Sequence, residues 1–202
     1  MKKLSTILLV SILAFTQACN SGDSNKDSVD NANDMNAKKD TTDVSNTKKD
    51  TMVNTMSVSD NVAKFAVGAA NGGMFEVELG KIAAEKATNK EVKDFGEMMV
   101  KDHTKANDEL KSIAADKNIT LPASISDDMQ KKIADINKES GKDFDKDYIN
   151  MMVKDHKDDI DDFEKEAKDS TYPALQSFAV KTLPTLYKHL GAAKAIQKSN
   201  HY

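Results

Sequence analysis

Four polar residues interrupt stretches of sequence that are otherwise apolar at helical spacing. They are one carboxylate and three imidazoles: Glu76, His103, His156 and His189. Each lies near the middle of a segment whose apolar residues recur with a period near 3.6, so a helix would turn its side chain toward the core. Imidazole nitrogen and carboxylate oxygen together suit zinc, iron, manganese or copper. We therefore predict that these four residues converge and form a metal site.

A buried hydrogen-bond network is the competing interpretation of the same residues. A histidine on an apolar helix face is more often a hydrogen-bonded core residue than a metal ligand. A buried carboxylate must be neutralised, find partners or bind a cation. The sequence leaves both interpretations open, and it does not identify the ion, for which zinc, iron and copper are candidates.

Two of the histidines end identical six-residue words. Met-Met-Val-Lys-Asp-His occupies residues 98–103 and again residues 151–156, which suggests a pseudo-twofold arrangement of two helix pairs. The preceding Asp102 and Asp155 are rotated by about 100° from the histidines on a helix. We expect these aspartates at helix–helix seams, bonded to a neighbouring Lys or His. The methionines of the words are interpreted as core packing rather than as ligands.

The helical period extends over four long segments, at about 61–87, 92–113, 144–167 and 173–196. A shorter amphipathic segment lies at 127–138, and no window alternates with period two. The sequence therefore predicts an all-α domain over residues 60–199, an antiparallel four-helix bundle with one short extra helix. The acidic run around Asp158, Asp159 and Asp161 is predicted to be a solvated helix face.

The N-terminus has the features of an export signal. Lys2 and Lys3 precede an apolar run over residues 4–15 that is too short to span a bilayer, so residues 1–18 are predicted to be a signal peptide of lipoprotein type. The chain's only cysteine, Cys19, follows directly and is the predicted site of lipidation. We expect the lipid to anchor the protein in a membrane of the bacterial envelope, and we favour the outer membrane. The domain would then lie in the periplasm or at the cell surface.

Residues 19–59 are rich in Asn, Asp, Ser, Thr and Lys and contain no Leu, Ile or aromatic residue. Such a segment buries too little apolar surface to offset its chain entropy, so it is predicted to be a disordered tether. Loss of Lys2 and Lys3 with residues 1–18 changes the net charge from −4 to −6. Without a basic face, nucleic-acid binding is not expected, and the sequence does not identify a protein partner.

Several ordered motifs carry a resemblance to a known family. They include Gly-Gly-Met-Phe-Glu-Val-Glu-Leu-Gly at 72–80, both histidine words, and Ser-Gly-Lys-Asp-Phe-Asp at 140–145. Over residues 61–197 the chain resembles the bacterial family called domain of unknown function 4142. The resemblance implies an exported protein, often labelled an outer-membrane protein, with a ferritin-like fold. The Glu-x-x-His motif of di-iron bundles is absent, because Val100 and Val153 precede the two histidines by three residues.

These observations favour a membrane-tethered envelope protein that binds a metal ion or a partner and is not an enzyme. Its expected role is in stress tolerance or metal homeostasis. One alternative is a metal-dependent enzyme that detoxifies an oxidant on the same bundle. Another is a purely structural or partner-binding bundle with a buried polar network. No nucleophile motif or phosphate-binding loop accompanies the histidines.

Overall fold

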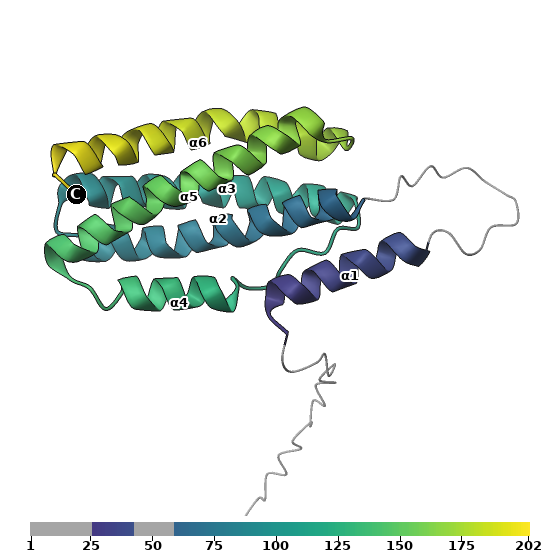
Figure 1. The fold of residues 1–202 in the computed structure, drawn as a ribbon, viewed down its shortest axis with the longest axis horizontal. Coiled ribbons are helices and arrows are strands. Elements are labelled where there is room, and N and C mark those ends of the chain that lie inside the picture. Colours follow the sequence, from purple (N-terminus) through teal and green to yellow (C-terminus); the bar gives the residue numbers. More distant parts are fainter. Residues whose placement is uncertain (1–25, 43–58) are drawn as a thin grey trace, which may run out of the picture.

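The structure, a computed structural model, describes residues 26–42 and 59–202, and every regular element in those residues is a helix. Four long helices form the bundle, and two shorter ones lie outside it (Figure 1). The elements are α1 (Ser28–Thr42), α2 (Asp60–Lys86), α3 (Lys90–Asp116), α4 (Asp127–Ile136), α5 (Gly141–Asp169) and α6 (Pro173–Ser199). The predicted all-α bundle is confirmed; α4 is the expected short helix, and α1 is a second short helix that was not predicted. None of the described helices is long and apolar enough to cross a membrane.

Local sequence signals explain where several helices begin. The side chain of Asn89 accepts a hydrogen bond from the Glu91 amide at the start of α3, and Ser126 accepts from the Met129 amide at the start of α4. Pro173 is the first residue of α6, where a missing N–H costs nothing.

The bundle consists of two antiparallel hairpins joined by a crossover. Helix α2 packs on α3 and α5 packs on α6, while α3 also contacts α6 and α2 contacts α5. The connection through α4 returns the chain along the outside of the bundle, so α3 and α5 run in the same direction from opposite corners (Figure 1). A pseudo-twofold axis along the bundle therefore exchanges α3 with α5 and α2 with α6. The two copies of the six-residue word lie on exchanged helices.

A polar layer divides the core into two apolar clusters. One cluster, toward the α2–α3 turn, includes Phe75, Met99, Tyr148 and Met152. The other, toward the opposite end, includes Leu110, Phe163, Phe178 and Leu186. Glu76 and the three buried histidines lie on the same helices between these groups.

Helices α2 and α3 approach closely at two glycines. A Cβ on Gly96 would lie 2.7 Å from the Gly80 carbonyl oxygen, and one on Gly80 would lie 3.0 Å from the Gly96 carbonyl oxygen. Only residues without a side chain fit at this crossing. The contact lies one turn from Glu76 along α2 and so fixes the spacing between the two helices that carry Glu76 and His103.

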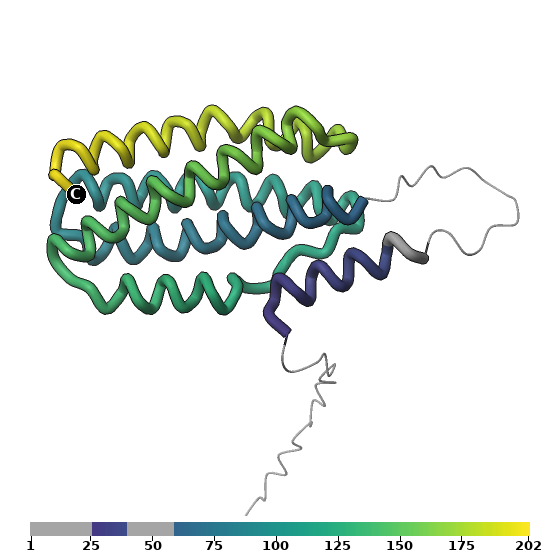
Figure 2. The backbone as a smooth tube through the Cα atoms, viewed as in Figure 1, coloured from purple at the N-terminus to yellow at the C-terminus, as the bar shows by residue number. Residues whose placement is uncertain are grey.

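The prediction of a disordered tether is wrong for residues 28–42, which form α1. The helix lies beside the segment that links α3 to α4 (Figure 2). Asn36 donates to the Thr120 carbonyl at 2.9 Å and accepts from the Thr120 amide at 2.7 Å, and Ser28 accepts from the Ala123 amide at 2.9 Å. Hydrogen bonds and one buried alanine, Ala32, hold α1 in place, so a polar composition was no guide to this helix. Residues 43–58 of the predicted tether, the signal peptide and Cys19 lie outside the described residues.

Replacing Asn36 with Ala should lower the free energy of unfolding by about 1 kcal/mol, because it removes both hydrogen bonds to the Thr120 backbone. Asn31, exposed on the same helix, is the matched control and should show a change within about 0.5 kcal/mol on replacement with Ala. Urea denaturation of the two variants measures both values. Equal effects would mean that helix propensity, not docking, determines the contribution of α1.

Candidate metal centre

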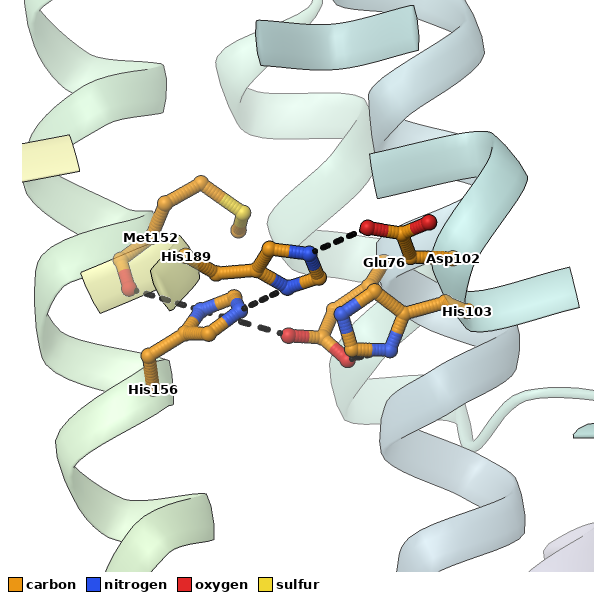
Figure 3. A network of polar contacts seen from close by, with 6 residues as sticks. All are labelled: Glu76, Asp102, His103, Met152, His156 and His189. Carbon is orange, nitrogen blue, oxygen red and sulfur yellow. Dashed lines mark hydrogen bonds and ion pairs between the residues drawn. The ribbon is translucent and has the colours of Figure 1, made fainter. Parts of the chain in front are cut away.

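Glu76 and the three histidines predicted as one cluster meet in the middle of the bundle (Figure 3). Glu76 comes from α2, His103 from α3, His156 from α5 and His189 from α6. The side chains of His156 and His189 are 0% exposed, and the exposed fractions of Glu76 and His103 are 2% and 6%. The structure thus brings together the four residues that the helical period had placed on the core face.

The tautomers of His156 and His189 follow from their fixed partners. His156 Nδ1 lies 3.0 Å from the Met152 carbonyl oxygen, which only accepts, so this nitrogen carries the proton. His189 Nε2 lies 3.0 Å from Asp102 Oδ2 and donates to it. The pKa of Asp102 is lowered: burial alone would raise it, but its bond to His189 and the charge of Lys188 outweigh that effect. Each ring therefore has its proton at the nitrogen that points away from the other ring.

The remaining nitrogens of these two rings face each other at 3.3 Å, His156 Nε2 to His189 Nδ1. Burial lowers the pKa of His156, and it lowers that of His189 to about 4, so both rings are neutral near pH 7. A hydrogen bond between them would need a proton that neither nitrogen carries. Two lone pairs directed at one point can together bind a cation.

His103 contributes a third unshared nitrogen. Its Nδ1 lies 2.8 Å from Glu76 Oε2 and donates to the carboxylate. Its Nε2 is buried and has no hydrogen-bond partner among the described residues. The Glu76 carboxylate orients His103 as Asp102 orients His189, and such carboxylate–histidine pairs are typical of histidines that ligate metals.

The spacing of the three rings fits a small tetrahedral ion. One ring nitrogen from each of His103, His156 and His189 lies within 4.8 Å of the others. Two ligands each 2.0–2.1 Å from a tetrahedral zinc ion are separated by about 3.3 Å, which is the distance between His156 Nε2 and His189 Nδ1. The three-nitrogen set leaves a fourth position for another ligand.

Burial and the neighbouring imidazoles act on Glu76 in opposite directions. Burial alone would raise its pKa, yet His103 first, then His156 and His189, hold the pKa of this carboxyl below its usual value. Its Oε1 lies 3.4 Å from His156 Nδ1 and accepts no hydrogen bond from the described residues. Glu76 is thus an ionised carboxylate with unused binding capacity at the centre of the protein.

A second acidic residue, Asp159, belongs to the site, and the prediction of a solvated face is wrong at this position. Asp159 is half-buried, and an oxygen of its carboxyl lies within 4.8 Å of the ligand atoms of Glu76 and His156. Burial and the adjacent Glu76 hold the pKa of Asp159 well above its usual range. Its spacing of three residues from His156, which places both on one helix face, was the signal that could have identified it.

The group formed by Glu76, His156 and Asp159 is a weaker candidate for a metal than the three histidines. His156 would have to use Nδ1 toward Glu76, and that nitrogen already donates to Met152. Only two carboxyl groups would remain, and the raised pKa of Asp159 disfavours the ionised form that would bind a metal. The chemistry of the donors therefore favours the three-histidine set.

The pseudo-twofold axis pairs Asp102 with Asp155, but their environments differ. Asp102 meets His189 of α6 and was correctly predicted to bond a seam histidine. On the exchanged side of the bundle Asp155 instead faces the negative charge of Glu76, and no bond to Lys or His is found for its buried Oδ2 among the described residues. Burial, followed by the Glu76 charge, raises the pKa of Asp155 to about 6. The same word thus gives a stabilising contact in α3 and a repulsive one in α5.

Comparison with known proteins gives a family and no function. The family described as "Domain of unknown function (DUF4142)" matches residues 47–196. No curated protein and no solved structure matches the chain. The matched region contains all of the residues discussed in this centre.

Proposed function

Because the chain belongs to the DUF4142 family, whose description assigns no activity, we propose a function from the site itself: a non-catalytic bundle that binds a divalent transition-metal ion through His103, His156 and His189. The observation that carries this proposal is the 3.3 Å approach of His156 Nε2 and His189 Nδ1, two nitrogens whose rings hold their protons elsewhere. Three imidazole nitrogens favour zinc, copper or iron over magnesium and calcium.

Glu76 orients His103 in this proposal, and its free oxygen is available to the same ion. The charge of a divalent ion is offset by the carboxylates of Glu76 and Asp102, which contact the rings of His103 and His189. A cation would also satisfy His103 Nε2 and Glu76 Oε1, both without a hydrogen-bond partner among the described residues. Buried polar atoms left unpaired cost about 1–3 kcal/mol each.

A binding role is favoured over turnover of an organic substrate by the size of the space beside the cluster. The adjoining cavity has a volume of about 20 Å³, lined by Glu76, His103 and Asp159 among others. This volume holds a single water molecule and admits no organic substrate.

The proposal includes attachment to a bacterial envelope membrane through lipid on Cys19. Its support is the position of the only cysteine directly after a short apolar run and two lysines. Mass spectrometry of the mature N-terminus tests it, and an unmodified Cys19 would contradict it.

Zinc should raise the melting temperature of the full chain after treatment with a chelator and dialysis. At free zinc of 100 times the Kd, binding to the native state alone stabilises by about 2.7 kcal/mol. Differential scanning calorimetry with zinc, copper, iron and manganese measures the shift. No shift with any of the four ions would overturn metal binding and leave a buried hydrogen-bond network as the role of the cluster.

The pH dependence of the shift follows from the buried histidines. Protons compete with a metal only near the pKa of the folded protein, and burial lowers that of His189 to about 4 from an ordinary 6.5. The zinc-induced shift should therefore persist at pH 6 and disappear as the pH falls toward about 4. A loss already complete at pH 6 would contradict ligation by His189 with its lowered pKa.

A further inference from the structure

The small cavity beside the cluster has one polar and one apolar side. Glu76, His103 and Asp159 form the polar side, while Phe163 and Phe178 are among the residues that close the other. Phe163 on α5 and Phe178 on α6 are buried, so an ion or a water molecule cannot pass these two rings without moving core side chains.

A much larger groove lies on the outer side of α2 and α3. It has a volume of about 890 Å³ and lies between α2, α3 and the segment that leads into α4. Its lining includes the carboxylates of Glu78 and Asp108, the thioether of Met74 and the hydroxyl of Ser124. Carboxylate, thioether and hydroxyl groups are all possible ligands of a cation, and the lining includes one cationic residue, Lys81.

Asn107 lines both the groove and the cavity. It follows His103 by one turn of α3, so the two side chains lie on the same face of the helix. Asn107 is half-buried, and no hydrogen bond of its side-chain amide is found within residues 26–42 and 59–202. The side chain thus borders both spaces, and no polar partner among the described residues fixes its amide.

Gly73 on α2 provides the place where this amide rests. A Cβ at position 73 would overlap Asn107 Oδ1 and would lie 3.0 Å from Asn107 Cγ. Any other residue at position 73 would push the amide away. Gly73, in the motif at 72–80, therefore leaves the space that the Asn107 amide occupies between groove and cavity.

We infer that a cation reaches the three-histidine site through this groove, and that Asn107 is the gate between groove and cavity. This inference rests on the proposed metal binding. The ion meets Glu78 and Asp108 first and then the neutral oxygen of the Asn107 amide. Beyond the gate, Glu76 and His103 receive it. Asn107 is a positioning residue that controls the rate of exchange, while the histidines determine the affinity.

The test is the exchange kinetics of Co²⁺ with the full chain, followed by the visible absorption of the bound ion. Asn107→Ala should accelerate uptake, and release to excess chelator, by about tenfold each, with the Kd changed less than about twofold. Asn107→Leu restores a side chain of the same size without a ligand oxygen, so both rates should stay at or below those of the natural chain. Circular dichroism melts confirm that each variant folds.

Thr104→Ala is the matched control, since Thr104 lines the groove but not the cavity. Its rates should equal those of the natural chain. Co²⁺ binding with rates that Asn107→Ala leaves unchanged would overturn the gate while metal binding stands, as would equal acceleration by Thr104→Ala. If the natural chain and all variants bind no Co²⁺, the metal proposal itself fails and the gate falls with it.

Discussion

In the metal-free protein at pH 7, Asp155→Asn should raise the free energy of unfolding by about 1–2 kcal/mol. The Asp155 carboxyl has a pKa of about 6 in the folded state against an ordinary 3.8, because of burial and the charge of Glu76. Two pKa units correspond to roughly 3 kcal/mol, and we take about half because Asp155 retains contact with solvent. Asparagine keeps the shape of the side chain and removes the repulsion.

The direction of this stability change follows from the rise in the Asp155 pKa on folding, and it depends on pH. A group whose pKa is raised on folding destabilises the folded state above the folded pKa, and the penalty disappears as the pH falls toward the unfolded pKa. For Asp155 the window runs from about 6 down to 3.8. Urea denaturation with chelator present should therefore show the gain at pH 7 and almost none at pH 4.

Asp102→Asn is the matched control, because Asp102 occupies the same position in the first copy of the word. Its carboxylate accepts from His189 Nε2 at 3.0 Å and also pairs with Lys188. Exchange for a neutral amide weakens a charge-assisted bond, so we expect a loss of about 1 kcal/mol. A destabilising Asp155→Asn, or the same sign for both variants, would show that Asp155 has a favourable partner in solution.

The helices and the convergence of the cluster could be predicted because both depend on the 3.6-residue period of the apolar residues. Glu76, His103, His156 and His189 occupy core positions of segments whose apolar residues repeat at 3.6, and four such helices can bury their stripes only against one another. The roles within the cluster depend on which atom faces which. The proton positions on His156 and His189 follow from the Met152 carbonyl and Asp102, contacts that a period does not specify.

The features that were missed lack an apolar signal. Helix α1 buries Ala32 and Asn36 and is held by hydrogen bonds to the backbone of the α3–α4 connection, so composition alone indicated a tether. Asp159 stands in a run of charges, most of which are solvated, and its separate role depends on its distance from Glu76. In both places polar tertiary contacts decide the structure, and hydrophobic patterning does not detect them.

Replacing His103 and His156 together with Gln should weaken zinc binding by roughly a thousandfold or more, equivalent to at least about 4 kcal/mol. The double variant removes two of the three unshared nitrogens, and a neutral amide oxygen is a poor substitute for imidazole at a zinc ion. Isothermal titration of the full chain with zinc at pH 7 measures the loss. An unchanged Kd would mean that the ion binds elsewhere on the chain.

Two single variants provide a comparison for the loss of zinc affinity in the double variant. Glu76→Gln retains all three rings and removes the carboxylate that accepts from His103 Nδ1 at 2.8 Å, so affinity should fall by about 10–100-fold. His201→Gln changes the one histidine outside the cluster, an exposed residue near the C-terminus, and should leave the Kd unchanged. If Glu76→Gln weakened zinc as much as the double variant does, Glu76 would itself be a ligand of the ion, as the sequence first predicted. An intermediate loss would instead assign it the orienting role that its bond to His103 indicates.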